Sequence, residues 1–271
     1  MLEGIWLREE YRNNLLVIFF FALFFTLISV YLTKFLLPIS YGLVSVFLVS
    51  LVGAYPLIAY LRSEENEEMV KRLSEDKLLA RHANELAIYL SFFLGVTFGY
   101  IISTYIFPAE FFSIQVEVIQ GIRGESIGGS AIGATGDVLG NVIISNLFEK
   151  IITNNLWVFF LTFVVSFLIS AGMVFVLVWN ASVLGVFLAK ASTGVADLQI
   201  LILSYLPHGI LEIAAYILAG LSGALLSYQF GYYYNTKKYK TETFVRVIKD
   251  SIILVIGGLF CLLIAGIIEI L

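Results

Sequence analysis

The residues in this sequence best suited to chemistry are a histidine and a glutamate four positions apart within an apolar run. They form the pattern Pro207-His208-Gly209-x-x-Glu212, and apolar residues continue on its C-terminal side. A proline is tolerated in the first turn of a helix, because its missing N–H would have no intrahelical partner there. The pattern therefore predicts a helix that begins at Pro207 and carries His208 and Glu212 on one face.

Three hypotheses stay open for the His208/Glu212 pair. In the first, a divalent metal such as zinc binds the imidazole and the carboxylate, and an intramembrane metalloenzyme would use it to activate water. Further ligands would come from Asp197, Asn155, Asn180 or water. In the second, the two side chains bond each other and the free N–H groups of a helix start, which locks the helices together. In the third, the pair lines a path for protons or a solute.

Small residues continue the helix face that carries the pair. Ala215, Ala219 and Gly223 follow His208 at +7, +11 and +15. Small side chains let two helix backbones approach closely in lipid, so another helix is predicted to pack along this face. The pair is then expected to point into a bundle, which also avoids the free-energy cost of exposing ionisable groups to hydrocarbon.

The composition is that of a membrane protein. Of the 271 residues, 60% are hydrophobic and 13% are charged, and the mean hydropathy is +0.95. Because a bilayer core about 30 Å thick takes roughly 20 apolar residues per helical crossing, we predict an all-α polytopic helix bundle, multi-pass in the plasma membrane. The net charge is only −4 and the basic residues form short clusters beside the apolar segments, so no nucleic-acid partner is expected.

About six apolar segments are long enough to be transmembrane helices. The predicted spans are Leu15–Thr33, Tyr41–Leu61, Leu86–Phe107, Leu156–Trp179, His208–Tyr228 and Ser251–Leu271. The first is too long for the core of a signal peptide and is expected to remain as a span. Polar or flexible residues recur at spacings of 7, 4, 7 and 7 along the fourth span, which predicts one inward-facing stripe: Asn155, Thr162, Ser166, Met173 and Asn180.

The segment 180–206 has no clear helical pattern. Gly185, Lys190, Gly194 and Asp197 interrupt apolar pieces of only about nine residues. Short interrupted pieces at membrane depth are typical of re-entrant helices, which line a cavity or are covered by protein. We therefore predict a broken or re-entrant segment here, which would also suit a transporter or channel.

Two hydrophilic segments divide the chain. Residues 62–85 form a charged connector, so residues 1–85 are an N-terminal hairpin plus connector and residues 86–271 a second membrane domain. Residues 108–155 form a Gly-rich extramembrane cap, whose start also fits a short strand and whose second half fits a helix. Protein partners are expected at the cap or the connector.

Basic residues indicate which side of the membrane each segment faces. With Arg8 and Arg12 before the first span, the N-terminus and connector 62–85 are predicted to be cytoplasmic and the cap to lie outside. Six crossings would put the other basic segment, 237–249, on the side opposite to the connector. The side of that segment stays open.

Other residues point to packing rather than chemistry. Gly95 and Gly99 have the four-residue spacing of close helix contacts, and predict a homodimer through this face. Asn154 and Asn155 precede the fourth span, where asparagine commonly caps a helix. No phosphate loop and no Gly-x-Ser-x-Gly or Ser/Lys nucleophile pattern is present in the sequence.

Three polar elements occur in a fixed order: Asn154-Asn155, Asn180-x-x-x-Leu184-Gly185 and Pro207-His208-Gly209-x-x-Glu212. This order resembles the stage II sporulation protein M (DUF95) family over roughly residues 86–271. The resemblance implies a multi-span scaffold, because the sporulation protein anchors peptidoglycan-degrading partners during engulfment and is not itself the hydrolase. The N-terminal hairpin and the Gly-rich cap indicate a divergent, non-sporulating prokaryotic member, with archaea among the candidate sources.

Overall fold

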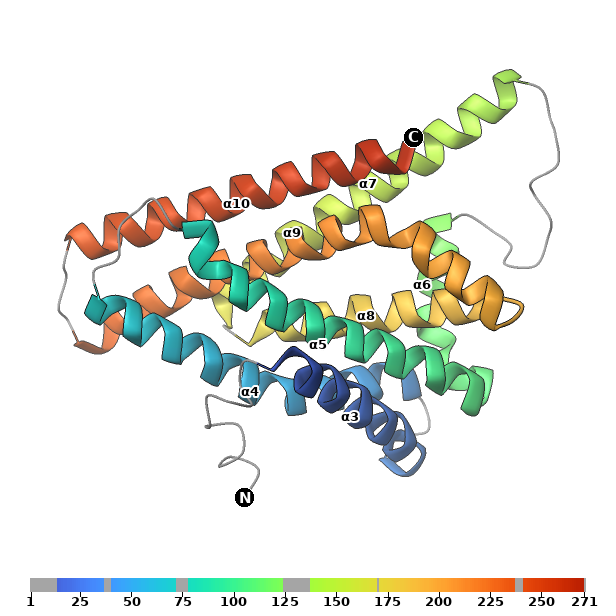
Figure 1. Ribbon diagram of the computed structural model, residues 1–271, viewed down its shortest axis with the longest axis horizontal. Coiled ribbons are helices and arrows are strands. Elements are labelled where there is room, and N and C mark those ends of the chain that lie inside the picture. Colours follow the sequence, from blue (N-terminus) through green and yellow to red (C-terminus); the bar gives the residue numbers. More distant parts are fainter. Residues whose placement is uncertain are drawn as a thin grey trace.

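The protein is helical throughout the part of the chain that the structure describes. The computed structural model describes residues 14–36, 40–71, 78–123, 137–169, 171–236 and 241–270, and every regular element within these ranges is a helix (Figure 1). The elements are α3 (Leu15–Leu36), α4 (Tyr41–Lys71), α5 (Leu78–Ile106), the 3-10 helix η2 (Ala109–Phe112), α6 (Ser113–Arg123), α7 (Asp137–Leu168), α8 (Gly172–Ala191), α9 (Val195–Thr236) and α10 (Thr241–Ile270). The predicted all-α fold is confirmed, and the alternative of a strand at the start of the cap is wrong.

The predicted number of membrane spans is also confirmed. Within the described ranges, six segments are long and apolar enough to cross a bilayer: Leu15–Leu36, Ala83–Ile106, Ile151–Leu168, Gly172–Ala191, Val195–Tyr234 and Phe244–Glu269. The apolar part of α4, Tyr41–Leu57, is shorter. The chain is therefore a multi-pass membrane protein, although its spans are not all those expected from the sequence.

The predicted fourth span is divided between two helices. α7 ends at Leu168 and α8 begins at Gly172, so the chain reverses direction between them. A Cβ atom at Gly172 would lie 2.4 Å from Cγ1 of Val165, and the Gly172 N–H donates to the carbonyl of Ile169 at 2.6 Å. Only a residue without a side chain fits this tight turn. The single polar stripe is wrong, because its first three members lie on α7 and its last two on α8.

The segment 180–206 is not a series of short pieces. α8 continues through Asn180 to Ala191, a turn follows at 192–194, and α9 runs through Pro207 to Thr236. The prediction that a helix begins at Pro207 is therefore wrong. α9 bends along its length instead (Figure 1), as expected where a proline removes one backbone hydrogen bond of a helix.

The additional reversal places both basic connectors at one end of the bundle. Between residues 72–77 and 237–240 the chain passes through four long helices, α5, α7, α8 and α9. The end of α4, the start of α5, the end of α9 and the start of α10 consequently lie at the same end, on the left in Figure 1. The conflict between six crossings and the charge bias therefore does not arise.

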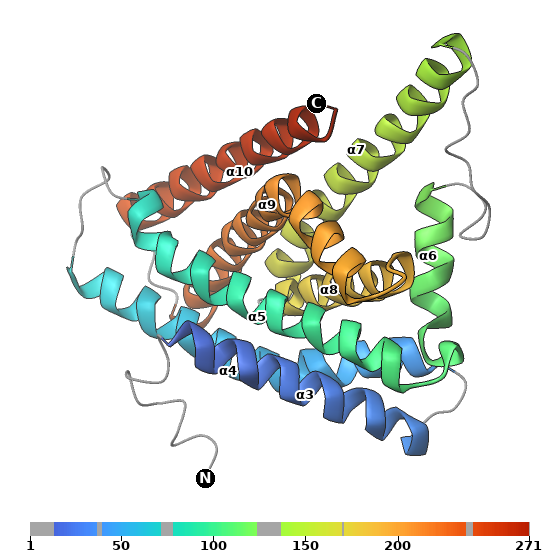
Figure 2. The same cartoon turned by 45° about the vertical axis from the view of Figure 1, so that its right-hand side comes forward.

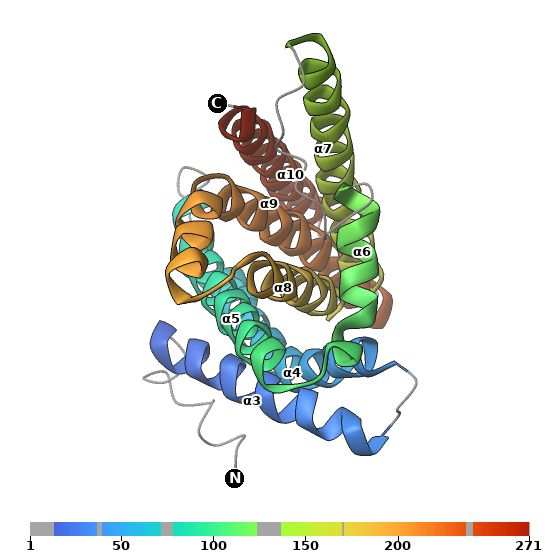
Figure 3. The same cartoon turned by 90° about the vertical axis from the view of Figure 1, so that its right-hand side faces the viewer.

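Three helices form the centre of the bundle. Between 67% and 72% of the spans in α5, α8 and α9 is buried, against 22–28% in α3, α7 and α10. Seen along the bundle, α8 is surrounded by α5, α6 and α9 (Figure 3). A Cβ atom at Gly185 would lie 2.6 Å from the carbonyl oxygen of Thr97, so α8 and α5 touch through their backbones.

The N-terminal hairpin packs on one side of this centre. Helices α3 and α4 lie along α5 and α8 (Figure 2). A Cβ atom at Gly95 would lie 2.3 Å from the carbonyl oxygen of Phe19, and one at Gly99 would lie 2.6 Å from Cβ of Thr26. The two glycines therefore seat α3 of their own chain. The glycine face assigned to a homodimer is therefore covered by α3 of the same chain, and a homodimer through another face stays a prediction.

Candidate functional site

A hydrogen-bonded cluster around Glu212 joins α7 to α9. Glu212 is buried, with 6% of its surface exposed. Its Oε1 accepts a hydrogen bond from Nδ2 of Asn155 at 2.6 Å, and its Oε2 accepts one from the hydroxyl of Tyr205 at 3.3 Å. The Tyr216 hydroxyl donates to Oδ1 of Asn155 at 2.9 Å. Both carboxylate oxygens of Glu212, and both the nitrogen and the oxygen of the Asn155 amide, thus have partners.

His208 enters the cluster through an aromatic contact. Its ring centroid lies 4.8 Å from that of Tyr205, and the two planes meet at 72° in an edge-to-face arrangement. His208 is half-buried, and among the described residues no hydrogen bond joins it to Glu212. The histidine and the carboxylate share a helix face, and Tyr205 connects them. We call Asn155, Tyr205, His208, Glu212 and Tyr216 the Glu212 cluster.

The glycine of the motif makes room for the tyrosine. A Cβ atom at Gly209 would lie 2.1 Å from Cε1 and 2.5 Å from Cδ1 of the Tyr205 ring. Any larger residue at this position would push the ring away from the helix and its hydroxyl away from Glu212. The pattern Pro207-His208-Gly209-x-x-Glu212 therefore extends back to Tyr205, which lies seven residues before the carboxylate and on the same face.

A second carboxylate approaches the cluster from α10. Glu269 lies close enough to interact electrostatically with Glu212, Tyr205 and Tyr216, and its Oε2 atom is buried. The sequence interpretation missed this residue and both tyrosines. Each left a signal: Glu269 is an acid at the end of an apolar span, and Tyr205 and Tyr216 lie seven residues before and four after Glu212.

The remaining predicted polar residues lie outside the cluster. Asn154 is half-buried and Asn180 donates to the carbonyl of its own helix four residues earlier, at 2.8 Å. Asp197 is exposed and accepts hydrogen bonds from the backbone N–H and the hydroxyl of Thr193, which close the turn between α8 and α9. Neither Asn180 nor Asp197 is placed beside His208.

The small residues of α9 bring its neighbours close. Ala215 and Ala219 are fully buried. A Cβ atom at Gly223 would lie 2.4 Å from the carbonyl oxygen of Phe163 on α7, and one at Gly258 of α10 would lie 3.2 Å from that of Ala215. α7 and α10 thus both pack against this part of α9, and Asn155 is within reach of Glu212.

The donor set of the cluster suits hydrogen bonding better than metal coordination. In the part of the chain that the structure describes, no group of three or more His, Cys, Asp and Glu side chains is arranged to hold an ion. A metal on Glu212 would have to displace the hydrogen bond from Asn155 or from Tyr205. A fully bonded buried network instead rigidifies the helices that it joins.

Comparison with known proteins shows that the Glu212 cluster lies in the part of the chain that matches a protein family. A family model described as stage II sporulation protein M matches residues 87–271, which include every member of the Glu212 cluster. An uncharacterized protein of the archaeon Methanocaldococcus jannaschii is 32% identical over 123 residues, covering 45% of this chain and 68% of that protein. No solved structure matches the chain.

Proposed function

Because the chain belongs to the stage II sporulation protein M family, we propose that it acts as a non-enzymatic membrane scaffold that presents an extramembrane helix to a protein partner. The observation that carries this proposal is the hydrogen bonding between Asn155 of α7 and Glu212 and Tyr216 of α9. These hydrogen bonds hold α7 against α9, and we call them the joint. Its polar groups bond to other groups of the protein.

A joint of this kind is effective in a membrane. Hydrocarbon offers no alternative partner to a polar side chain, so interhelical hydrogen bonds favour one arrangement of the helices. A catalytic or transport site needs a group that can reach a substrate. The central groups of Asn155 and Glu212 are instead engaged with each other and with two tyrosines.

The joint lies at the base of a projecting helix. α7 is 32 residues long, and its part Ile151–Leu168 has the length and composition of a span. The preceding residues 137–150, which we call the α7 arm, extend about 20 Å at 1.5 Å per residue and project from the bundle (Figures 1 and 2). Asn155 lies in the first turns of the spanning part, five residues after the end of the arm, so its bonds to α9 fix the direction in which the arm points.

The sequence of the α7 arm is suited to a helical partner. Leu139, Ile143 and Leu147 recur every four residues, which is the pattern of helices that dock into an apolar groove. The basic residues near the first span and in the two connectors favour a cytoplasmic N-terminus in a plasma membrane. The arm, at the opposite end of the bundle, would then meet a partner outside the cytoplasm.

Site-specific photo-crosslinking in native membranes tests this proposal. A photoreactive residue at Ile143 is expected to yield one discrete protein adduct, while the same residue at Trp157, which is 68% exposed on the spanning part of α7, yields lipid adducts only. Asn155→Leu should lower the Ile143 adduct, because the arm loses its joint. Absence of a protein adduct at positions 139, 143 and 147 in a correctly folded chain would overturn the scaffold proposal.

A second function, cation or proton transport, is favoured by one observation. Glu212 and Glu269, from adjacent helices, interact electrostatically among tyrosine hydroxyls within the spanning region. Flux measurements on the purified chain in liposomes separate this function from the scaffold. A cation or proton flux that Glu269→Gln abolishes would replace the scaffold proposal, and the scaffold predicts no flux in either protein.

A further inference from the structure

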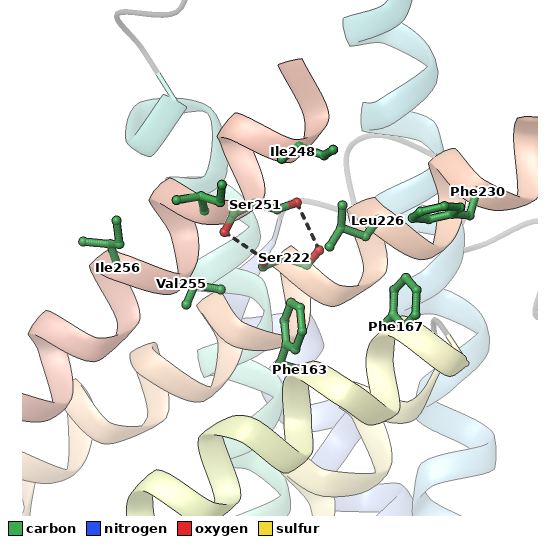
Figure 4. A pocket seen from close by; sticks show the side chains of 10 residues that line it. Phe163, Phe167, Ser222, Leu226, Phe230, Ile248, Ser251, Val255 and Ile256 are labelled. Atoms are coloured by element: carbon green, nitrogen blue, oxygen red, sulfur yellow. Dashed lines mark hydrogen bonds between the residues drawn. The ribbon is translucent and has the colours of Figure 1, made fainter. Parts of the chain in front are cut away.

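An apolar cavity of about 420 Å³ lies between α7, α9 and α10 (Figure 4). Its first lining residue on α9, Ser222, follows Glu212 by ten residues. Its volume is within the range of ligand sites, roughly 300–1,000 Å³. Its walls come from three helices: Phe163 and Phe167 of α7, Ser222, Leu226 and Phe230 of α9, and Ile248, Ser251, Ile252, Val255 and Ile256 of α10.

The walls of this cavity offer only hydrocarbon to an occupant. The two serines are the only polar lining residues, and each is already engaged. The Ser222 hydroxyl donates to the carbonyl of Ser251 at 2.9 Å, and the Ser251 hydroxyl donates to the carbonyl of Ser222 at 3.3 Å, as the dashed lines in Figure 4 show. A polar solute would lose its hydration there without gaining hydrogen bonds, so the occupant must be apolar.

The cavity can be entered sideways from the bilayer. Ile252 and Ile256 line it and are 52% and 61% exposed, on a helix of which only 28% of the span is buried. In a multi-pass membrane protein that exposed face borders lipid. An acyl chain therefore has a direct route between α7 and α10.

Positive charges lie where a lipid headgroup would be. Lys249 and Arg246 are both exposed and lie at the start of the part of α10 that lines the cavity: Arg246 is two residues before Ile248, and Lys249 is three residues before Ile252 on the same face. The basic sequence of 237–240 precedes them. We infer that the cavity holds an acyl chain of an anionic phospholipid whose headgroup is bound by Lys249 and Arg246.

Native mass spectrometry of the purified full-length chain tests this inference. Phosphatidylglycerol and phosphatidylcholine with identical acyl chains are added in equal amounts. The wild type is expected to retain one phosphatidylglycerol in preference to phosphatidylcholine, by about fivefold for each basic residue that contributes. Lys249→Ala combined with Arg246→Ala should abolish this preference. Ile252→Trp, which fills the cavity, should reduce retention of both lipids.

The matched control is Ile253→Trp, one residue away and not in the cavity wall, with 47% of its side chain exposed. It should retain both lipids as the wild type does. If Ile252→Trp yields no folded protein, Ile256→Trp from the same wall applies the same test. Equal retention of the two lipids by the wild type, or undiminished retention by both tryptophan variants in the wall, would overturn the inference.

Discussion

At the scale of single residues, Glu212 is held from two helices, and its removal should cost more stability than that of an exposed carboxylate. Glu212→Ala leaves the amide nitrogen of Asn155 and the hydroxyl of Tyr205, both part-buried, without their hydrogen-bond acceptor, and a lost partner of this kind costs up to about 1–3 kcal/mol of stability. The midpoint of thermal unfolding in detergent should therefore fall by several degrees, and less in Glu212→Gln, which keeps the acceptor for Asn155. Glu117→Ala, at an exposed site, should leave the midpoint unchanged. Equal midpoints for Glu212→Ala and Glu117→Ala would contradict the joint.

Gly209 should tolerate no side chain, although alanine normally favours a helix over glycine by about 1 kcal/mol. The added methyl group of Gly209→Ala would meet the Tyr205 ring, so we expect a destabilisation of about 1–3 kcal/mol instead. Gly231→Ala, in the same helix with nothing within 4 Å of its Cβ position, is the control and should be neutral or stabilising. Combining Gly209→Ala with Tyr205→Ala should cost less than the sum of the single changes. Additive losses in chemical unfolding would show that the two residues are independent.

The purified protein should contain no stoichiometric zinc. Both oxygens of Glu212 accept hydrogen bonds from the protein, and His208 packs edge-on against Tyr205. Elemental analysis of the wild type and of His208→Ala is therefore expected to give the same low metal content. One zinc per chain in the wild type, lost in His208→Ala, would restore the metal hypothesis.

The sequence predicted part of the Glu212 cluster, for a physical reason. Counting at 3.6 residues per turn places His208 and Glu212 on one face whether the helix begins at Pro207 or at Val195, since the count depends only on local geometry. The contacts of Asn155 depend instead on how α7 crosses α9. That crossing is set by Gly223 against the backbone of α7, which no local pattern reveals.

At the scale of elements, the sequence analysis missed the chain reversal between α7 and α8, because no charged residue or proline marks it. The apolar pattern continues without interruption from α7 into α8, so one span was predicted where two helices meet. The reversal depends on Gly172 fitting against Val165, a contact made only once the helices have packed. Pro207 caused the opposite error. A helix start was predicted there, but α9 continues through the proline by bending.

Contact between α3 and α5 should be sensitive to a single methyl group. Gly95→Ala would place its Cβ atom against the backbone carbonyl of Phe19, which cannot rotate away, so we expect a loss of about 1–3 kcal/mol. Gly257→Ala in α10, whose Cβ position has only one neighbour at 3.9 Å, should leave stability unchanged. The oligomeric mass should be the same in both variants. A change of mass with unchanged stability in Gly95→Ala would show that this glycine faces a second copy.

At the scale of the whole molecule, the reversals between α7 and α8 and between α8 and α9 determine which segments share a side of the membrane. Four long helices separate the two basic connectors, so both lie at one end of the bundle, as the charge bias favours. The α7 arm and the turn between α8 and α9 lie at the other end. Lipid contacts at Lys249 and protein contacts at the arm would consequently occur on opposite sides of one membrane.

Cysteine labelling of intact cells can test this arrangement. The native Cys261 is first changed to serine, and single cysteines are placed at Ser74, Tyr239 and Thr193. A membrane-impermeant maleimide should label the cysteine at position 193 in intact cells, and those at 74 and 239 only after permeabilisation. An even number of crossings separates positions 74 and 239, so they share a side, whereas an odd number separates either from 193. The basic residues of the two connectors favour the cytoplasm for the shared side. The cysteine-free protein is the control for background. Labelling of 74 and 239 from opposite sides would mean that α7 and α8 form one continuous span, and that the reversal at Gly172 does not exist in the membrane.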